Sequence, residues 1–122
     1  MTDTPSIEIR LTPEFQRKLR TLAKKYRQVQ ADLRPIVEQL QFGALLGDRI
    51  PGIGSPVMKV RLKNSDIQKG KSGGYRLIYW ISSPESIVLL DIYSKSEQQD
   101  IEVAEIRQII KEFSTQSEET EN

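Results

Sequence analysis

The chain has 122 residues and a formal net charge of +1, and 37% of its residues are hydrophobic, which is enough for the core of one domain. It contains no cysteine and no histidine, which excludes disulfide bonds, thiolate nucleophiles and the commonest general acid/base and zinc ligand, so we expect no metal site. The segment MTDTPSIEIR has no apolar signal-peptide core and no later run is apolar enough to span a membrane, so we expect a cytoplasmic protein.

The first third of the sequence predicts one strand and two helices. Residues 7–11 alternate apolar and polar side chains, as a half-buried strand does. Thr12 is a suitable N-cap, and Pro13 a suitable first residue, for the helix that follows. The apolar face of this helix would consist of Phe15, Leu19, Leu22, Ala23 and Tyr26. A second helix is expected to begin with Asp32 as its cap and to end at Gly43, so that the two form a helical hairpin.

The rest of the sequence predicts three strands and a last helix. An irregular connection rich in glycine and proline, residues 43–56, comes first. The strands are expected at residues 57–63, 74–81 and 87–94, the last two joined by a turn at 82–86. An amphipathic helix follows at 103–113. Residues 114–122 are too polar to pack, so we expect them to form an acidic, disordered tail.

These elements predict a single α+β domain over residues 1–113, with the order β-α-α-β-β-β-α. Short connections between the last three strands imply antiparallel neighbours. The apolar helix faces need a sheet to pack against. We therefore expect a small, mostly antiparallel four-stranded sheet packed against the N-terminal helical hairpin, with a C-terminal helix.

Basic residues are concentrated between positions 59 and 76. This stretch holds six lysine or arginine residues against one acidic residue, Asp66. In the predicted strand, Lys59, Arg61 and Lys63 share one face and apolar residues share the other. A positive surface attracts a polyanion even when the net charge is small. Alternatively, the three cations form only the solvated face of a strand.

The stretch KGKSGGYRLIYW, residues 69–80, contains the GKS that ends a phosphate-binding P-loop. That motif needs a glycine where this chain has Ser65, and it must lead into a helix. The residues after Gly74 are instead aromatic and β-branched, which favours a strand. The sequence therefore argues against nucleotide binding at this motif.

Three stretches occur in a characteristic order: VMKVRLK at 57–63, KSGGYRLIY at 71–79 and YSKSE at 93–97. Together they resemble the RelE/ParE superfamily of bacterial toxins, and the RelE/HigB-like branch within it, over about residues 7–113. The resemblance implies the toxin of a toxin–antitoxin pair. Such a toxin is an mRNA interferase, an endoribonuclease that enters the ribosomal A site, cuts translated mRNA by attack of the 2′-hydroxyl without metal or cofactor, and is inhibited by an antitoxin.

The resemblance also implies roles for the basic residues. Arg76 would stabilise the charge that develops on the phosphate, because a guanidinium stays charged and presents two donors. Arg61, Lys63 and Lys95 would complete the catalytic set, as phosphate ligands or in proton transfer. The residues expected to contact RNA are Lys59, Lys69, Lys71, Gly73, Gly74 and Tyr93.

Two positions depart from the RelE pattern. The arginine that follows the lysine of the last strand in RelE is Ser96 here, and a tyrosine near the start of the last helix is Glu102. Proton transfer must then use other groups, and Lys63, Lys71 or Lys95 could exchange a proton. Glu97, Asp100 or Glu102 could serve as general base if one of them lies near the cations, and the sequence does not choose among them.

Several structural alternatives apply to the same residues. Arg76 could form a structural ion pair with Asp91. The aromatic residues of the central strand are expected in the core more than on an RNA-stacking surface, although Tyr75 and Tyr93 could stack a base. The expected core aromatics are Tyr75, Tyr79 and Trp80.

Two other functions fit the same fold. One is a ParE-like poison of DNA gyrase, and the other is a degenerate toxin that acts only as a binding module. The antitoxin could dock on the sheet edge or on the apolar flank of the last helix around Ile106 and Ile110.

Overall fold

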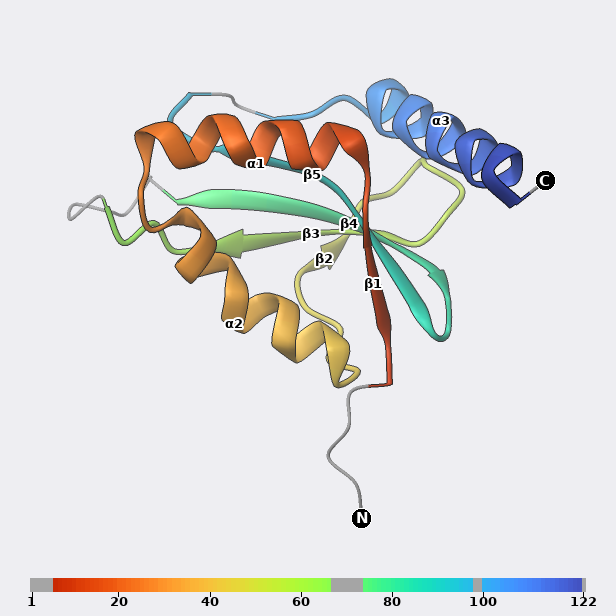
Figure 1. Ribbon diagram of the computed structural model, residues 1–122, viewed down its shortest axis with the longest axis horizontal. Coiled ribbons are helices and arrows are strands. Elements are labelled where there is room, and N and C mark those ends of the chain that lie inside the picture. Colours follow the sequence, from red (N-terminus) through yellow and green to blue (C-terminus); the bar gives the residue numbers. More distant parts are fainter. Residues whose placement is uncertain (1–5, 67–73, 98–99, 122) are drawn as a thin grey trace, which may run out of the picture.

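The computed structural model describes residues 6–66, 74–97 and 100–121 (Figure 1). Its elements are β1 (Glu8–Leu11), α1 (Pro13–Lys25), α2 (Val29–Gln41), β2 (Asp48–Arg49), β3 (Val57–Leu62), β4 (Tyr75–Ser83), β5 (Ser86–Ser94) and α3 (Val103–Glu121). The α+β class, the helical hairpin and the C-terminal helix are confirmed.

The strands form one mixed sheet in the order β1-β5-β4-β3-β2. The expected antiparallel meander of β3, β4 and β5 is present. β1 pairs with β5 in parallel, and β2 pairs with β3. The described sheet thus has five strands, where the sequence predicted four. The missed strand, β2, lies inside the connection at 43–56 and is two residues long, too short to produce a period-two pattern.

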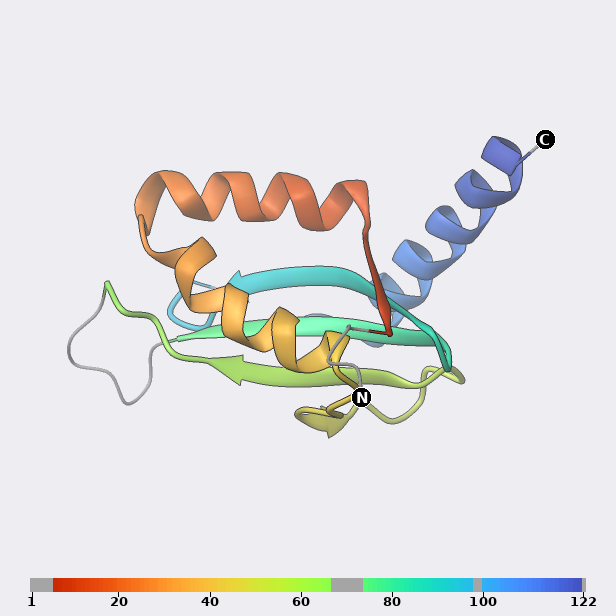
Figure 2. The ribbon, with the colours of Figure 1, turned by 60° about the horizontal axis from the view of Figure 1, so that its bottom comes forward.

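The sheet is covered on both faces, because side chains of successive strand residues point to opposite sides. α1 and α2 lie over one face, as Figure 2 shows, and α3 packs on the other. The buried side chains on the first face, which we call the hairpin core, include Phe15, Leu22, Leu33, Leu40, Val60, Leu62, Tyr75, Leu77, Tyr79 and Leu89. Those on the second face, which we call the α3 core, include Val57, Ile78, Val88, Leu90, Tyr93, Ile106 and Ile109.

Thr12 caps α1 as the sequence predicts. Its hydroxyl oxygen accepts a hydrogen bond from the backbone N–H of Phe15 at 2.9 Å. The same hydroxyl lies 3.3 Å from the carbonyl oxygens of Leu89 and Leu90, to which it can donate. The cap therefore also fixes the start of α1 against β5.

The start of α2 differs from the prediction, since Asp32 is not its cap. The helix begins at Val29, and its Gln28 N–H donates to the carboxylate of Asp66 at 2.9 Å. Asp32 lies in the first turn, and its carboxylate accepts hydrogen bonds from the backbone and hydroxyl of Ser65. The carboxylate that bonds to the helix start thus comes from the chain after β3, which local sequence cannot reveal. The two carboxylates hold that chain against α2.

α3 continues past the expected end at residue 113 and includes residues 114–121. A helix satisfies its own backbone hydrogen bonds, so polar residues can extend it without a buried face. Disorder of this stretch in solution stays a prediction. Among the described helices, none has the length and apolar character needed to cross a bilayer.

Gly74 lets β4 start beside the end of β3. Its φ is +93°, and a Cβ there would lie 2.5 Å from the carbonyl oxygen of Leu62. We expect Gly74→Ala to lower the free energy of unfolding by about 3 kcal/mol, from left-handed strain plus this clash. Urea denaturation followed by circular dichroism measures it.

The matched control is Gly43→Ala. Gly43 has a φ of +98° but no atom within 4 Å of an added Cβ, so it shares the backbone strain and lacks the clash. We expect a loss of about 1 kcal/mol. Equal losses in the two variants would show that the contact with Leu62 does not constrain the strand pair.

Candidate functional site

A row of polar side chains crosses the centre of the sheet. Arg61 of β3 lies opposite Arg76 of β4, and Arg76 lies opposite Tyr93 of β5. Directly opposite residues point to the same face, and neighbouring strands are about 4.8 Å apart. All three were predicted separately from the sequence as site residues, and the register brings them together. We call them the cross-strand row, and they lie on the face that carries α3.

The two arginines of the row face each other without a counter-ion among the described residues. Arg61 is exposed and Arg76 is half-buried, and neither forms an ion pair with a described residue. Within the described part of the chain, Arg76 donates a single side-chain hydrogen bond, of 3.2 Å, to the carbonyl oxygen of Tyr75. Like charges directly opposite each other destabilise a strand pair. A bound anion would relieve this repulsion, so the row is a candidate phosphate site.

Asp91 forms no ion pair with Arg76, so the predicted structural pairing of these two residues is wrong. The Oδ1 atom of Asp91 lies 2.9 Å from the Nζ atom of Lys18 on α1. The carboxylate is buried and Lys18 is its cation, so Arg76 keeps its charge for another partner.

Asp100 lies beside the row. Its Oδ1 atom accepts hydrogen bonds from the hydroxyl of Tyr93 and the N–H of Ile101, each at 3.0 Å. The ammonium of Lys59 lies 3.4 Å from the same oxygen. Because Lys59 is two residues before Arg61 on β3, both point to the same face. Asp100 therefore joins the expected RNA contacts Lys59 and Tyr93 to the cross-strand row.

The environment fixes the charge state of this cluster. Partial burial acts to raise the pKa of Asp100, but hydrogen bonds from Tyr93 and Ile101 and the charge of Lys59 outweigh it and lower that pKa. Burial and the bond to Asp100 raise the pKa of the Tyr93 hydroxyl. At neutral pH the pair is therefore an ionised carboxylate and a neutral phenol.

The aromatic residues are mainly structural. Tyr75 and Tyr79 are fully buried in the hairpin core, which confirms the expectation for them, and Trp80 is half-buried. Tyr93 as a whole is 3% exposed and belongs to the α3 core. The structure thus places Tyr93 where its hydroxyl holds Asp100, and gives its ring face no access to a base.

The remaining predicted residues divide into two groups. Lys63 is exposed directly after β3, and the N–H of Lys95 donates to the carbonyl oxygen of Gly74 at 2.9 Å. These residues therefore lie near the end of the β3–β4–β5 meander, where Leu62 pairs with Tyr75. Lys69, Lys71 and Gly73 lie outside the described residues.

The other two candidate carboxylates do not contact the row. Glu97 accepts hydrogen bonds from Lys25 and, at 3.0 Å, from the hydroxyl of Tyr26, both at the end of α1. The hydrogen bond from Lys25, followed by that from Tyr26, lowers the pKa of Glu97. Glu102 is exposed and forms no ion pair with a described residue.

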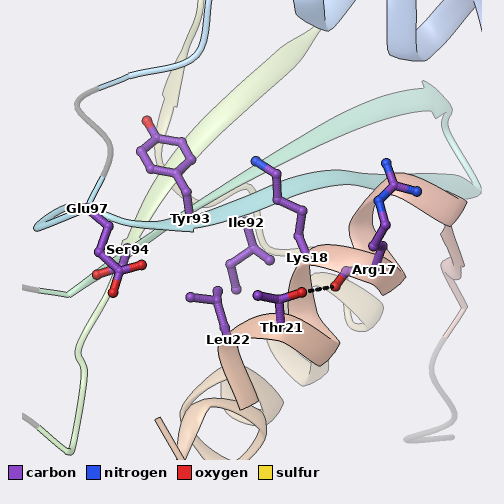
Figure 3. Close-up of a pocket in the computed structure, with 8 residues that line it drawn as sticks. All are labelled: Arg17, Lys18, Thr21, Leu22, Ile92, Tyr93, Ser94 and Glu97. Atoms are coloured by element: carbon purple, nitrogen blue, oxygen red, sulfur yellow. Dashed lines mark hydrogen bonds between the residues drawn. The ribbon is translucent and has the colours of Figure 1, made fainter. Parts of the chain in front are cut away.

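Figure 3 shows a pocket of about 380 Å³ between α1 and β5 that the sequence analysis did not predict. Leu22 and Ile92 point toward each other inside it, whereas the ring of Tyr93 projects away from them. Its lining residues are Arg17, Lys18, Thr21, Leu22, Ile92, Tyr93, Ser94 and Glu97. The single acidic residue in the apolar run 87–93, Asp91, was the available signal that a cation such as Lys18 must lie behind this strand.

Comparison with known proteins identifies a family. The family model described as RelE toxin of RelE / RelB toxin-antitoxin system matches residues 12–122. Among solved structures, the chain is similar to TrmO from Pseudomonas aeruginosa, with 20% sequence identity and a TM-score of 0.43. The match covers 76% of this chain and 37% of that one, so this chain spans little more than a third of that protein's length.

The Lys18–Asp91 pair gives the fold a pH dependence. Burial raises the pKa of Asp91, and Lys18 opposes that shift. When folding raises the pKa of an acid, that acid contributes most to the stability of the fold below its unfolded pKa, which is about 3.9. The contribution is lost as the pH rises through the pKa of the folded state. Lys18→Met raises this pKa further. We therefore expect it to cost about 3 kcal/mol at about pH 7.5 and much less near pH 4.

Chemical denaturation at both pH values checks this prediction. Arg17→Met is the control, because Arg17 is the preceding residue and its side chain is 60% exposed. We expect it to cost less than about 1 kcal/mol at either pH. A loss for Lys18→Met that does not change with pH would show that the charge of Asp91 is not what Lys18 compensates.

Proposed function

The chain belongs to the RelE toxin family of toxin–antitoxin systems, and from this premise we propose that it is a ribosome-dependent mRNA endoribonuclease that inhibits translation. We also propose an antitoxin as its partner, which the description of the matching family as part of a toxin-antitoxin system supports. The ribosome, the mRNA substrate and a cytoplasmic location are parts of the proposal. The observation that carries it is the cross-strand row, in which Arg61 and Arg76 face each other without a described counter-ion.

The proposed reaction is internal transesterification of RNA. The 2′-oxygen loses its proton to a base and forms a bond to the adjacent phosphorus. The bond between phosphorus and the 5′-oxygen then breaks, and that oxygen takes a proton from water. The products are a 2′,3′-cyclic phosphate and a 5′-hydroxyl end, and the step needs neither a metal nor a cofactor.

Arg76 and Arg61 would stabilise the phosphorane. In this transition state an additional negative charge develops on the equatorial oxygens, and two guanidiniums on adjacent strands can each present paired N–H donors to them. The neighbouring strand supplies Tyr93, so the site is closed on that side by a neutral group. The repulsion between the arginines is then relieved most when the phosphate carries its greatest charge.

Further cations would hold the RNA backbone. We assign Lys63 and Lys95 to the catalytic set with the two arginines, because both lie near the end of the β3–β4–β5 meander. Lys59, Lys69, Lys71, Gly73 and Gly74 are proposed as RNA contacts. These phosphate contacts would make binding weaken with rising salt concentration.

A defined translation system tests the function. We expect the purified protein to produce new mRNA 5′ ends at codon-spaced positions only when ribosomes are present. Arg76→Ala should lower the cleavage rate by about 100-fold or more, because it removes a donor pair from the transition state. Arg76→Lys should recover only part of the rate, since an ammonium cannot bind two oxygens in the same geometry.

Arg34→Ala serves as the control, because Arg34 is an exposed arginine on α2, which packs on the opposite face of the sheet. We expect it to cleave at the rate of the unchanged protein. Intact mRNA together with arrested growth on expression would reject the nuclease and make DNA gyrase the next target. Intact mRNA with normal growth would indicate a degenerate toxin that only binds.

A further inference from the structure

The proposed reaction requires a proton acceptor, and three carboxylates follow β5 in the sequence. The structure separates them. Glu97 is engaged with Lys25 and Tyr26 at the end of α1, and Glu102 is exposed without an ion pair among the described residues. Asp100 alone of the three contacts residues of the cross-strand row and its basic face.

We propose that the carboxylate of Asp100 is the general base that removes the proton of the 2′-hydroxyl. This inference rests on the proposed function and deepens it, because it assigns one residue to the step that the sequence left open. In the step, the O–H bond of the 2′-hydroxyl breaks, its proton passes to Asp100, and the electron pair forms the new bond from oxygen to phosphorus. The proton is later released to water.

The position of Asp100 suits this role. It contacts Lys59. Lys59 is two residues before Arg61 on β3, so the two lie on the same face with their backbones about 6.6 Å apart. Asp100 also contacts Tyr93, which is paired across the strands with Arg76. In RNA the 2′-oxygen and the 3′-oxygen that carries the attacked phosphorus are on adjacent carbons of one ribose. A phosphate held by the arginines would thus bring its 2′-hydroxyl to the neighbourhood of Asp100.

The carboxylate is both oriented and accessible. Three donors from three separate parts of the chain, Tyr93, Ile101 and Lys59, converge on its Oδ1 atom and fix its orientation. Even so, 61% of the side chain is exposed, so a substrate can reach it. These bonds favour the ionised form, which is the form that a base requires at neutral pH.

Neither neighbour is as suitable. The hydroxyl of Tyr93 is buried and bonded to a carboxylate, which keeps it protonated at neutral pH. Lys59 donates toward the same carboxylate and so acts as a cation there. The alternative is that Asp100 is a positioning residue that merely orients Lys59, and the experiment must separate the two roles.

The first measurement is single-turnover cleavage on programmed ribosomes by the full-length protein. We expect Asp100→Asn, which keeps the shape and removes the basic oxygen, to lower the maximal single-turnover rate constant by about 100-fold or more. The protein concentration that gives half of the maximal rate should change less than about threefold. Glu105→Gln, an exposed carboxylate of α3, is the matched control and should keep the full rate.

The second measurement is chemical rescue of Asp100→Ala. Because the site is open to solvent, a small carboxylate can occupy the place of the missing side chain and accept the proton. We expect added formate to restore cleavage in proportion to its concentration, and acetate, the stronger base, to restore more per mole. Sodium chloride at equal ionic strength should restore none.

The outcomes are distinct from those that test the nuclease itself. If the unchanged protein leaves mRNA intact, the proposed function fails and this inference fails with it. If the protein cleaves and Arg76→Ala abolishes cleavage while Asp100→Asn cleaves at the full rate, only the base is wrongly assigned. A lowered single-turnover rate constant in Asp100→Asn, together with no rescue of Asp100→Ala that follows the basicity of the added carboxylate, would overturn the assignment of the base and leave Asp100 as a positioning residue.

Discussion

The antiparallel pairing of β3 with β4 is the constraint on which the rest of this structure depends. It places Arg61 opposite Arg76 on one face, and Leu62 opposite Tyr75 on the other. A slip of one residue would turn the arginines into the hairpin core and the apolar residues toward α3. The two cores, one on each face, therefore specify the register, and the register in turn creates the candidate site.

The distribution of ion pairs supports the same conclusion. Three acidic residues on β5 or shortly after it form ion pairs with lysines, and among them Asp91 is paired with Lys18 and Asp100 with Lys59. Glu97 is likewise matched to Lys25, and each of these pairs joins two parts of the chain. The arginines of the cross-strand row are not neutralised in this way by described residues. Their repulsion destabilises the strand pair locally. Burial of the surrounding apolar side chains offsets it, because each large one contributes roughly 1.5–3 kcal/mol to stability.

Much of the fold could be predicted because its signals are local. The alternation at 57–63 indicated β3 and its basic face, and Thr12 with Pro13 indicated the start of α1. The predictions that were wrong concern a contact between distant residues and a very short strand. The carboxylate that bonds to the start of α2 comes from Asp66 instead of Asp32, and β2 is too short to leave a pattern. Local sequence carries no information about a hydrogen-bond partner 38 residues away.

For the candidate site, the sequence by itself determined which residue types are present: arginines and lysines on a basic strand, three possible carboxylates, and neither histidine nor cysteine. Only the tertiary structure decided which of them meet. It brought Asp100 to Lys59 and Tyr93, directed Glu97 to α1, and gave Asp91 to Lys18. The physical reason is that side-chain spacing along a strand follows from sequence, whereas partners across strands and helices depend on register and packing.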